Sequence, residues 1–73
     1  MNENEVWATT LDDKYSVTVT REAPHRGILR IAEGDKVLHT ETVGLMYDAL
    51  FGPDIGDVAR WQGIATRFVD SRT

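Results

Sequence analysis

Two histidines are the residues of this 73-residue chain best suited to acid–base chemistry. His39 precedes Glu41 by two positions, and a histidine oriented by a carboxylate is one way to build a general base. The spacing also matches the H-x-E part of the zinc deaminase signature, but the cysteine part is absent because the chain contains no cysteine. Arg30, His39 and Glu41 are instead predicted to form a cross-strand polar cluster on the open face of a sheet.

The other reactive residue types lie in contexts that favour structural roles. Asp12 and Asp13 belong to a predicted turn and lack the ligand spacing of a calcium-binding loop. His25 and Arg26 lie in a predicted loop, where anion binding is conceivable and a solvated loop tip is the simpler interpretation. No nucleophile elbow, P-loop, dinucleotide fingerprint or zinc-protease motif occurs in the sequence. A chain of this size also has little volume to enclose a typical ligand pocket of about 300 Å³ or more. The sequence therefore predicts no enzyme, no metal and no cofactor.

Composition narrows the possible partners. The net charge is −4 and the acidic residues are spread along the chain, which argues against nucleic acid and membrane because phosphate binding requires clustered Lys and Arg. No run approaches the ~20 apolar residues of a membrane span, and the N-terminus lacks the features of a signal peptide. Cysteine is absent as well. These three observations predict a cytoplasmic protein. Small chains without disulfides or metals often gain stability by self-association, which favours a homodimer.

The first half of the chain predicts two β-hairpins. Both contain β-branched residues in alternation with polar ones, and turn residues separate the strands. The predicted strands are residues 5–11 and 15–21 in the first hairpin, and 28–33 and 36–43 in the second. Residues 22–27, around Pro24, are predicted to be a loop. A two-residue turn at Gly34-Asp35 gives a register with Ile31 opposite Leu38 and Arg30 opposite His39.

The second half predicts a short helix over residues 44–51 and an amphipathic helix over residues 53–69. Gly56 and Gly63 lie one heptad apart on the latter, and each costs about 1 kcal/mol relative to alanine in a helix interior. Close approach of another helix would explain both glycines, and so would a frayed first turn together with a tolerated Gly63. Trp61 is expected to pack in the core, although tryptophan is also enriched in interfaces. The candidate interaction surface comprises Gly56, Arg60, Trp61, Gly63, Ile64 and Arg67.

These patterns predict a single α+β domain over residues 1–73. The expected architecture is a four-stranded antiparallel meander with a short helix and a longer C-terminal helix packed on one face. The expected function is that of a small acidic, non-catalytic protein-interaction module, homodimeric through the helix flank or a sheet edge. The alternative is a compact acidic inhibitor, of the kind that phages and mobile elements encode, that blocks a basic nucleic-acid-binding site on a host protein.

Overall fold

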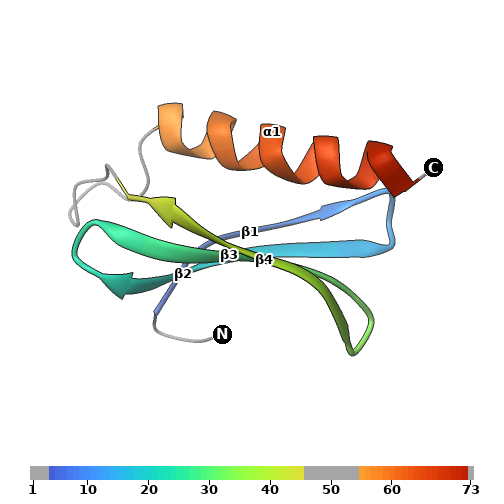
Figure 1. The fold of residues 1–73 in the computed structure, drawn as a ribbon, viewed down its shortest axis with the longest axis horizontal. Coiled ribbons are helices and arrows are strands. Elements are labelled where there is room, and N and C mark those ends of the chain that lie inside the picture. The colour runs from blue at the N-terminus through green and yellow to red at the C-terminus, as the bar shows by residue number, and fades with distance from the viewer. Residues whose placement is uncertain (1–3, 46–54, 73) are drawn as a thin grey trace.

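A single antiparallel sheet and one helix make up the fold of the computed structural model, which describes residues 4–45 and 55–72. The strands follow the order β1-β2-β3-β4, and α1 lies along one face of the sheet (Figure 1). The elements are β1 (Glu5–Leu11), β2 (Tyr15–Ala23), β3 (Arg26–Glu33), β4 (Lys36–Gly44) and α1 (Ile55–Arg72). The predicted meander with a C-terminal helix is confirmed. The predicted short helix lies outside the described residues, except for Gly44 and Leu45, of which Gly44 ends β4.

The core lies between the sheet and α1. Alternate residues of β2 and β3 point toward the helix, and every fourth residue of α1 points back toward the sheet. The fully buried side chains include Val17, Val19, Leu29, Ile31, Trp61 and Ala65. Ile55 at the start of α1 is 87% exposed and Gln62 is exposed as well, so neither belongs to the face that packs on the sheet. The apolar stripe that the sheet covers has the width usual for a surface helix.

The connection between β2 and β3 corrects the predicted loop over residues 22–27. Both strands extend toward each other, and only Pro24 and His25 separate Ala23 from its partner Arg26. Proline has no N–H to contribute to a ladder, but its fixed φ suits a turn. A shift in register between Arg21 and Ala23 absorbs the extra residue.

The register between β3 and β4 also differs from the prediction. Ile31 lies opposite His39 and Arg30 lies opposite Thr40, because the register shifts between Ile31 and Ala32. The physical reason is the spacing of the apolar residues in β4: Leu38 and Val43 are five positions apart, so a regular strand cannot direct both to one face. The extra residue of the bulge lets Leu38 pack against the core while Val43 is buried.

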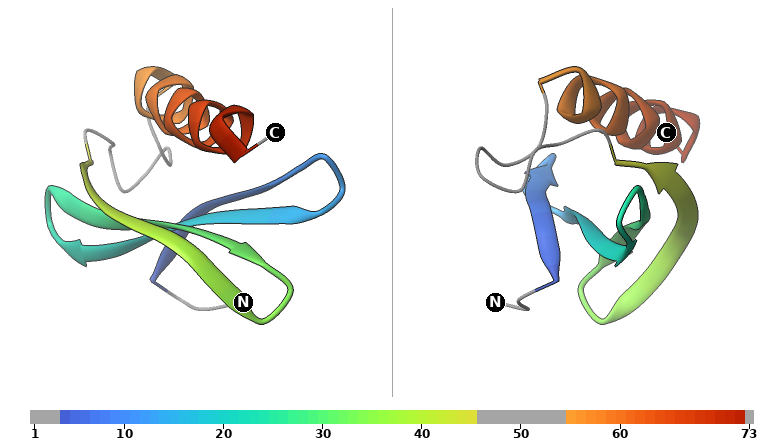
Figure 2. Two further views of the ribbon diagram at one scale, coloured as in Figure 1. Left: turned by 45° about the vertical axis from the view of Figure 1, so that its right-hand side comes forward. Right: turned by 90° about the vertical axis from the view of Figure 1, so that its left-hand side faces the viewer.

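A similar shift occurs in β1 between Glu5 and Trp7. The neighbouring residues Val6 and Trp7 both pack against the core, which a regular strand would not allow. The Trp7 ring then meets Trp61 of α1, with the ring centroids 5.7 Å apart. Both edge strands of the twisted sheet in Figure 2 thus carry a bulge, which increases the local twist.

Candidate interaction surface

The outer face of α1, directed away from the sheet, carries a shallow groove. Its lining residues are all exposed, and three of them have short side chains, so the helix backbone is close to the surface. They recur at helical spacings of three and four, which places them along one side of α1. The α1 groove, as we call it below, is lined by Ala59, Arg60, Gln62, Gly63, Thr66 and Arg67.

Gly63 lies in the middle of this groove and has no packing reason to be glycine. A Cβ atom added to it would meet no atom within 4 Å outside the neighbouring turns of its own helix. Glycine in a helix interior costs about 1 kcal/mol relative to alanine because more backbone entropy is lost on folding. Packing among the described residues does not offset this cost.

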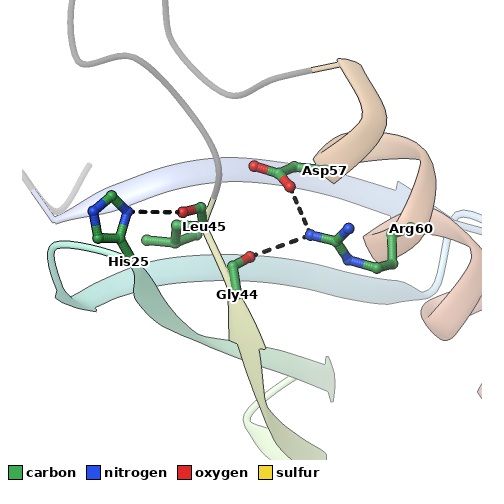
Figure 3. A network of polar contacts seen from close by, with 5 residues as sticks. All are labelled: His25, Gly44, Leu45, Asp57 and Arg60. Carbon is green, nitrogen blue, oxygen red and sulfur yellow. Dashed lines mark hydrogen bonds and ion pairs between the residues drawn. The ribbon is translucent and has the colours of Figure 1, made fainter.

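Arg60 is held at the N-terminal end of the groove by a polar network (Figure 3). Its Nη2 donates to Oδ1 of Asp57 at 2.6 Å and lies 3.5 Å from the carbonyl oxygen of Gly44. The Asp57 carboxylate is buried in the first turn of α1, where the helix dipole favours a negative charge. One side of the guanidinium is thus anchored, while the Arg60 side chain remains half exposed.

The end of β4 is fixed within the same network. The backbone N–H of Leu45 donates to the carbonyl oxygen of His25 at 3.0 Å, and His25 Nδ1 lies 3.4 Å from the carbonyl oxygen of Leu45. Together with the contact between Arg60 and Gly44, these bonds tie the β2–β3 turn, the end of β4 and the start of α1 to one another. The groove is therefore positioned on a braced part of the fold.

Arg67 supplies the second positive charge of the groove. It is exposed and forms no ion pair or hydrogen bond with any residue in the ranges 4–45 and 55–72. It lies seven positions after Arg60, on the same side of α1. A chain with a net charge of −4 thus presents two arginines beside a strip of small side chains. The groove is electrostatically suited to an anionic ligand or partner.

The structure brings together only part of the predicted surface. Arg60, Gly63 and Arg67 line the groove, and Gly56 is exposed at the start of α1. The Trp61 side chain is fully buried, so it belongs to the core. Ile64 is partly buried and packs against the core. The predicted surface did not include Ala59, Gln62 and Thr66, which also line the groove. Ala59 lies four residues before Gly63 and Thr66 lies three residues after it, so helical spacing places both beside this glycine.

The predicted polar cluster on the open sheet face is wrong, because the β4 bulge separates its members. His39 and Glu41 lie opposite the buried residues Ile31 and Leu29, so their side chains share the face that α1 covers. The exposed Arg30 lies opposite Thr40, on the other face. His39 Nε2 lies 3.1 Å from Glu41 Oε1.

The His39 ring has a packing role against the helix. It stacks on the ring of Phe68 with a centroid separation of 5.0 Å and an interplanar angle of 26°. The Arg72 guanidinium lies 5.7 Å from the Phe68 centroid, within the range of a cation–π contact. These residues join the edge of β4 to the C-terminal half of α1.

Comparisons with known proteins identify no relatives: no protein-family model matches the chain, and searches of curated proteins and of solved structures give no match either. Within residues 4–45 and 55–72, no group of three or more His, Asp or Glu side chains is arranged to hold a metal ion. No helix in the part of the chain that the structure describes is long and apolar enough to cross a membrane.

Proposed function

We propose that this chain is a small acidic, non-catalytic protein-interaction module that acts in the cytoplasm and binds a partner protein through the α1 groove. The observation that carries the proposal is Gly63, which keeps the floor of the groove open at a cost that packing within the described fold does not offset. An interface that needs close approach to the helix backbone would compensate for that cost. Exposed small residues in a helix are used in this way when two backbones pack closely.

The charges beside the groove favour an acidic partner segment. Arg67 is available for a bidentate contact with a carboxylate, and Arg60 is already oriented by Asp57. Arginine is enriched in protein interfaces, where it supplies planar hydrogen bonding together with apolar contact. A partner surface with a carboxylate near Arg67 and small or apolar side chains over Gly63 would complement both features.

The non-catalytic part of the proposal is supported by the role of His39. Its ring stacks on Phe68 of α1 and its Nε2 faces Glu41 of the same strand, so the structure gives His39 a packing role between β4 and α1.

The alternative, an acidic inhibitor of a basic site, remains a prediction that the described charges do not favour. Asp12, Asp13 and Asp35 lie in the two turns at one end of the sheet, but lysines lie among them. Lys14 Nζ lies 3.5 Å from Glu33 Oε2, so one of the acids at that end is already paired within the chain. An inhibitor that imitates nucleic acid would be expected to present its acids as a continuous stripe.

A differential capture experiment tests the proposed function. The wild-type protein, Arg67→Glu and the matched control Arg30→Glu are each immobilised and exposed to extract of the source cell. Both substitutions reverse the charge of one exposed arginine, one beside the groove and one on the open sheet face. We expect a defined protein to be retained by the wild type and the control, with affinity for Arg67→Glu reduced roughly tenfold because the charge of the contact is reversed. Capture of nothing specific by the wild type, or equal capture by all three, would contradict the proposal.

A further inference from the structure

Within the described residues, the α1 groove, the β4 edge and the β1 edge are each candidate surfaces for pairing with a second copy of the chain. The groove is unsuitable for self-association about a twofold axis. Such an axis places the same surface of each copy against the other, so Arg60 and Arg67 of one copy would meet the same arginines of the second. Like charges in direct opposition cost binding energy and suppress that pairing.

The β4 edge carries features that protect it against pairing. The bulge at Leu38 interrupts its ladder, and the strand contains the charged residues Lys36 and Glu41. Bulges and charged side chains are the means by which natural sheets keep an exposed edge from pairing with another chain. The β4 edge is therefore the less suitable of the two edges.

The β1 edge lacks this protection over five residues. The run from Trp7 to Leu11 contains no charged side chain, and it pairs with β2 without any shift in register, since the only shift in this pair lies before Trp7. No strand within residues 4–45 and 55–72 pairs with its outer side. A neutral, regular edge of this kind is a template for strand addition.

The direction of the backbone groups in β1 can be deduced from the turn that follows it. The N–H of Lys14 donates to the carbonyl oxygen of Leu11 at 3.1 Å, so the Leu11 carbonyl points toward the β2 side. Backbone groups alternate in direction along an antiparallel strand, which directs those of Trp7 and Thr9 toward β2 as well. The N–H and C=O groups of Ala8 and Thr10 therefore point outward at the edge.

We propose that the chain homodimerises by antiparallel pairing of β1 with β1 of a second copy, about a twofold axis at Thr9. Ala8 then lies opposite Thr10 of the second copy, and each such pair exchanges both of its backbone hydrogen bonds. Trp7 lies opposite Leu11 of the second copy on the face that bears α1. Both side chains are half-buried in one copy, and the pairing covers more of their surface. The two four-stranded sheets become one continuous sheet.

This dimer goes beyond partner binding at the α1 groove, because it uses a different surface. The paired segment is short, so the interface is smaller than that of an obligate dimer and the affinity should be modest. Pairing through β1 also leaves the α1 groove of each copy open. The two binding events can therefore be tested separately.

The test is the molar mass of the full chain, measured by sedimentation equilibrium from low to high micromolar concentrations. Ala8→Lys combined with Thr10→Lys places two lysines at the β1 edge. Thr40→Lys combined with Thr42→Lys makes the same kind of change at exposed positions of β4 and serves as the matched control. We expect the wild type and the β4 variant to dimerise at the same concentration, and the β1 variant to need at least tenfold more protein. Circular dichroism verifies that each variant is folded.

Amide hydrogen exchange of the wild type supplies an independent measurement that needs no variant. We expect the Ala8 and Thr10 amides to exchange more slowly at high than at low protein concentration, because only the dimer pairs them. A wild type that stays monomeric at high micromolar concentration overturns the inference, and so does a dimer that the β1 variant leaves intact. Neither result affects partner capture through Arg67, so a failure here is distinguishable from a failure of the proposed function.

Discussion

At the scale of single residues, the proposed interaction depends on how polar and small side chains are used in α1. Asp57 illustrates the difference between what the sequence predicts for a residue and what its surroundings in the structure show. From the sequence it is an acid near a helix start, which the helix dipole favours. The structure adds that its carboxylate is buried and binds Arg60 at 2.6 Å. Burial could not be predicted, because it depends on how the start of α1 packs against the end of β4, which the helical pattern of residues 53–69 does not specify.

Replacing Asp57 with alanine should therefore destabilise the fold. The change removes a charge-assisted hydrogen bond from a buried position, and we expect the free energy of unfolding to fall by about 2 kcal/mol. Urea denaturation at neutral pH measures the change. Arg67→Ala is the control, since it removes an exposed charge without an ion pair among the described residues from the same helix and should alter stability by less than about 0.5 kcal/mol. Equal effects of the two substitutions would contradict the anchoring role of Asp57.

At the scale of elements, strand existence and order followed from residue alternation, whereas register did not. The turn residues at 34–35 correctly located the second hairpin, and counting outward from them gave a register that is wrong beyond Ala32. The missing information was the distance between apolar residues within β4. Leu38 and Val43 are an odd number of positions apart, so both can face the core only if one residue is bulged out of the ladder. Adjacent Val6 and Trp7 give the corresponding signal in β1.

The observed register can be tested by adding a charge opposite Arg30. Thr40→Glu places a carboxylate directly across from this arginine on the open face, and a cross-strand ion pair contributes about 0.2–1 kcal/mol. We expect Thr40→Glu to be more stable than Thr40→Gln by an amount in this range. The difference should vanish when Arg30 is replaced by alanine. A double-mutant cycle by thermal denaturation measures the coupling, and zero coupling would contradict the bulged register.

At the scale of the whole molecule, the arrangement separates two surfaces. The helix covers one face of the sheet and β1 forms one edge of the sheet (Figures 1 and 2). The residues that line the α1 groove are exposed, so the groove is directed away from the sheet. A dimer joined at β1 would carry one α1 groove on each copy, so the module would be bivalent for its partner. Bivalent binding raises the overall affinity when the partner also presents two sites within reach. The sequence alone predicted an interaction surface on this helix and core packing for Trp61. The structure confirms the core packing, since Trp61 is fully buried, and it leaves Gly63 on the exposed side of α1.

We propose that the α1 groove is kept open for a partner at a cost in stability. The most direct test measures stability and partner retention together for Gly63→Ala, with Ala59→Gly as the reciprocal control in the same groove. We expect Gly63→Ala to be more stable than the wild type by about 1 kcal/mol and to retain the captured partner at least tenfold more weakly, because the added methyl group fills the floor of the groove. Ala59→Gly should lose about 1 kcal/mol and still bind. A Gly63→Ala protein that is more stable and binds its partner as tightly as the wild type would contradict the claim.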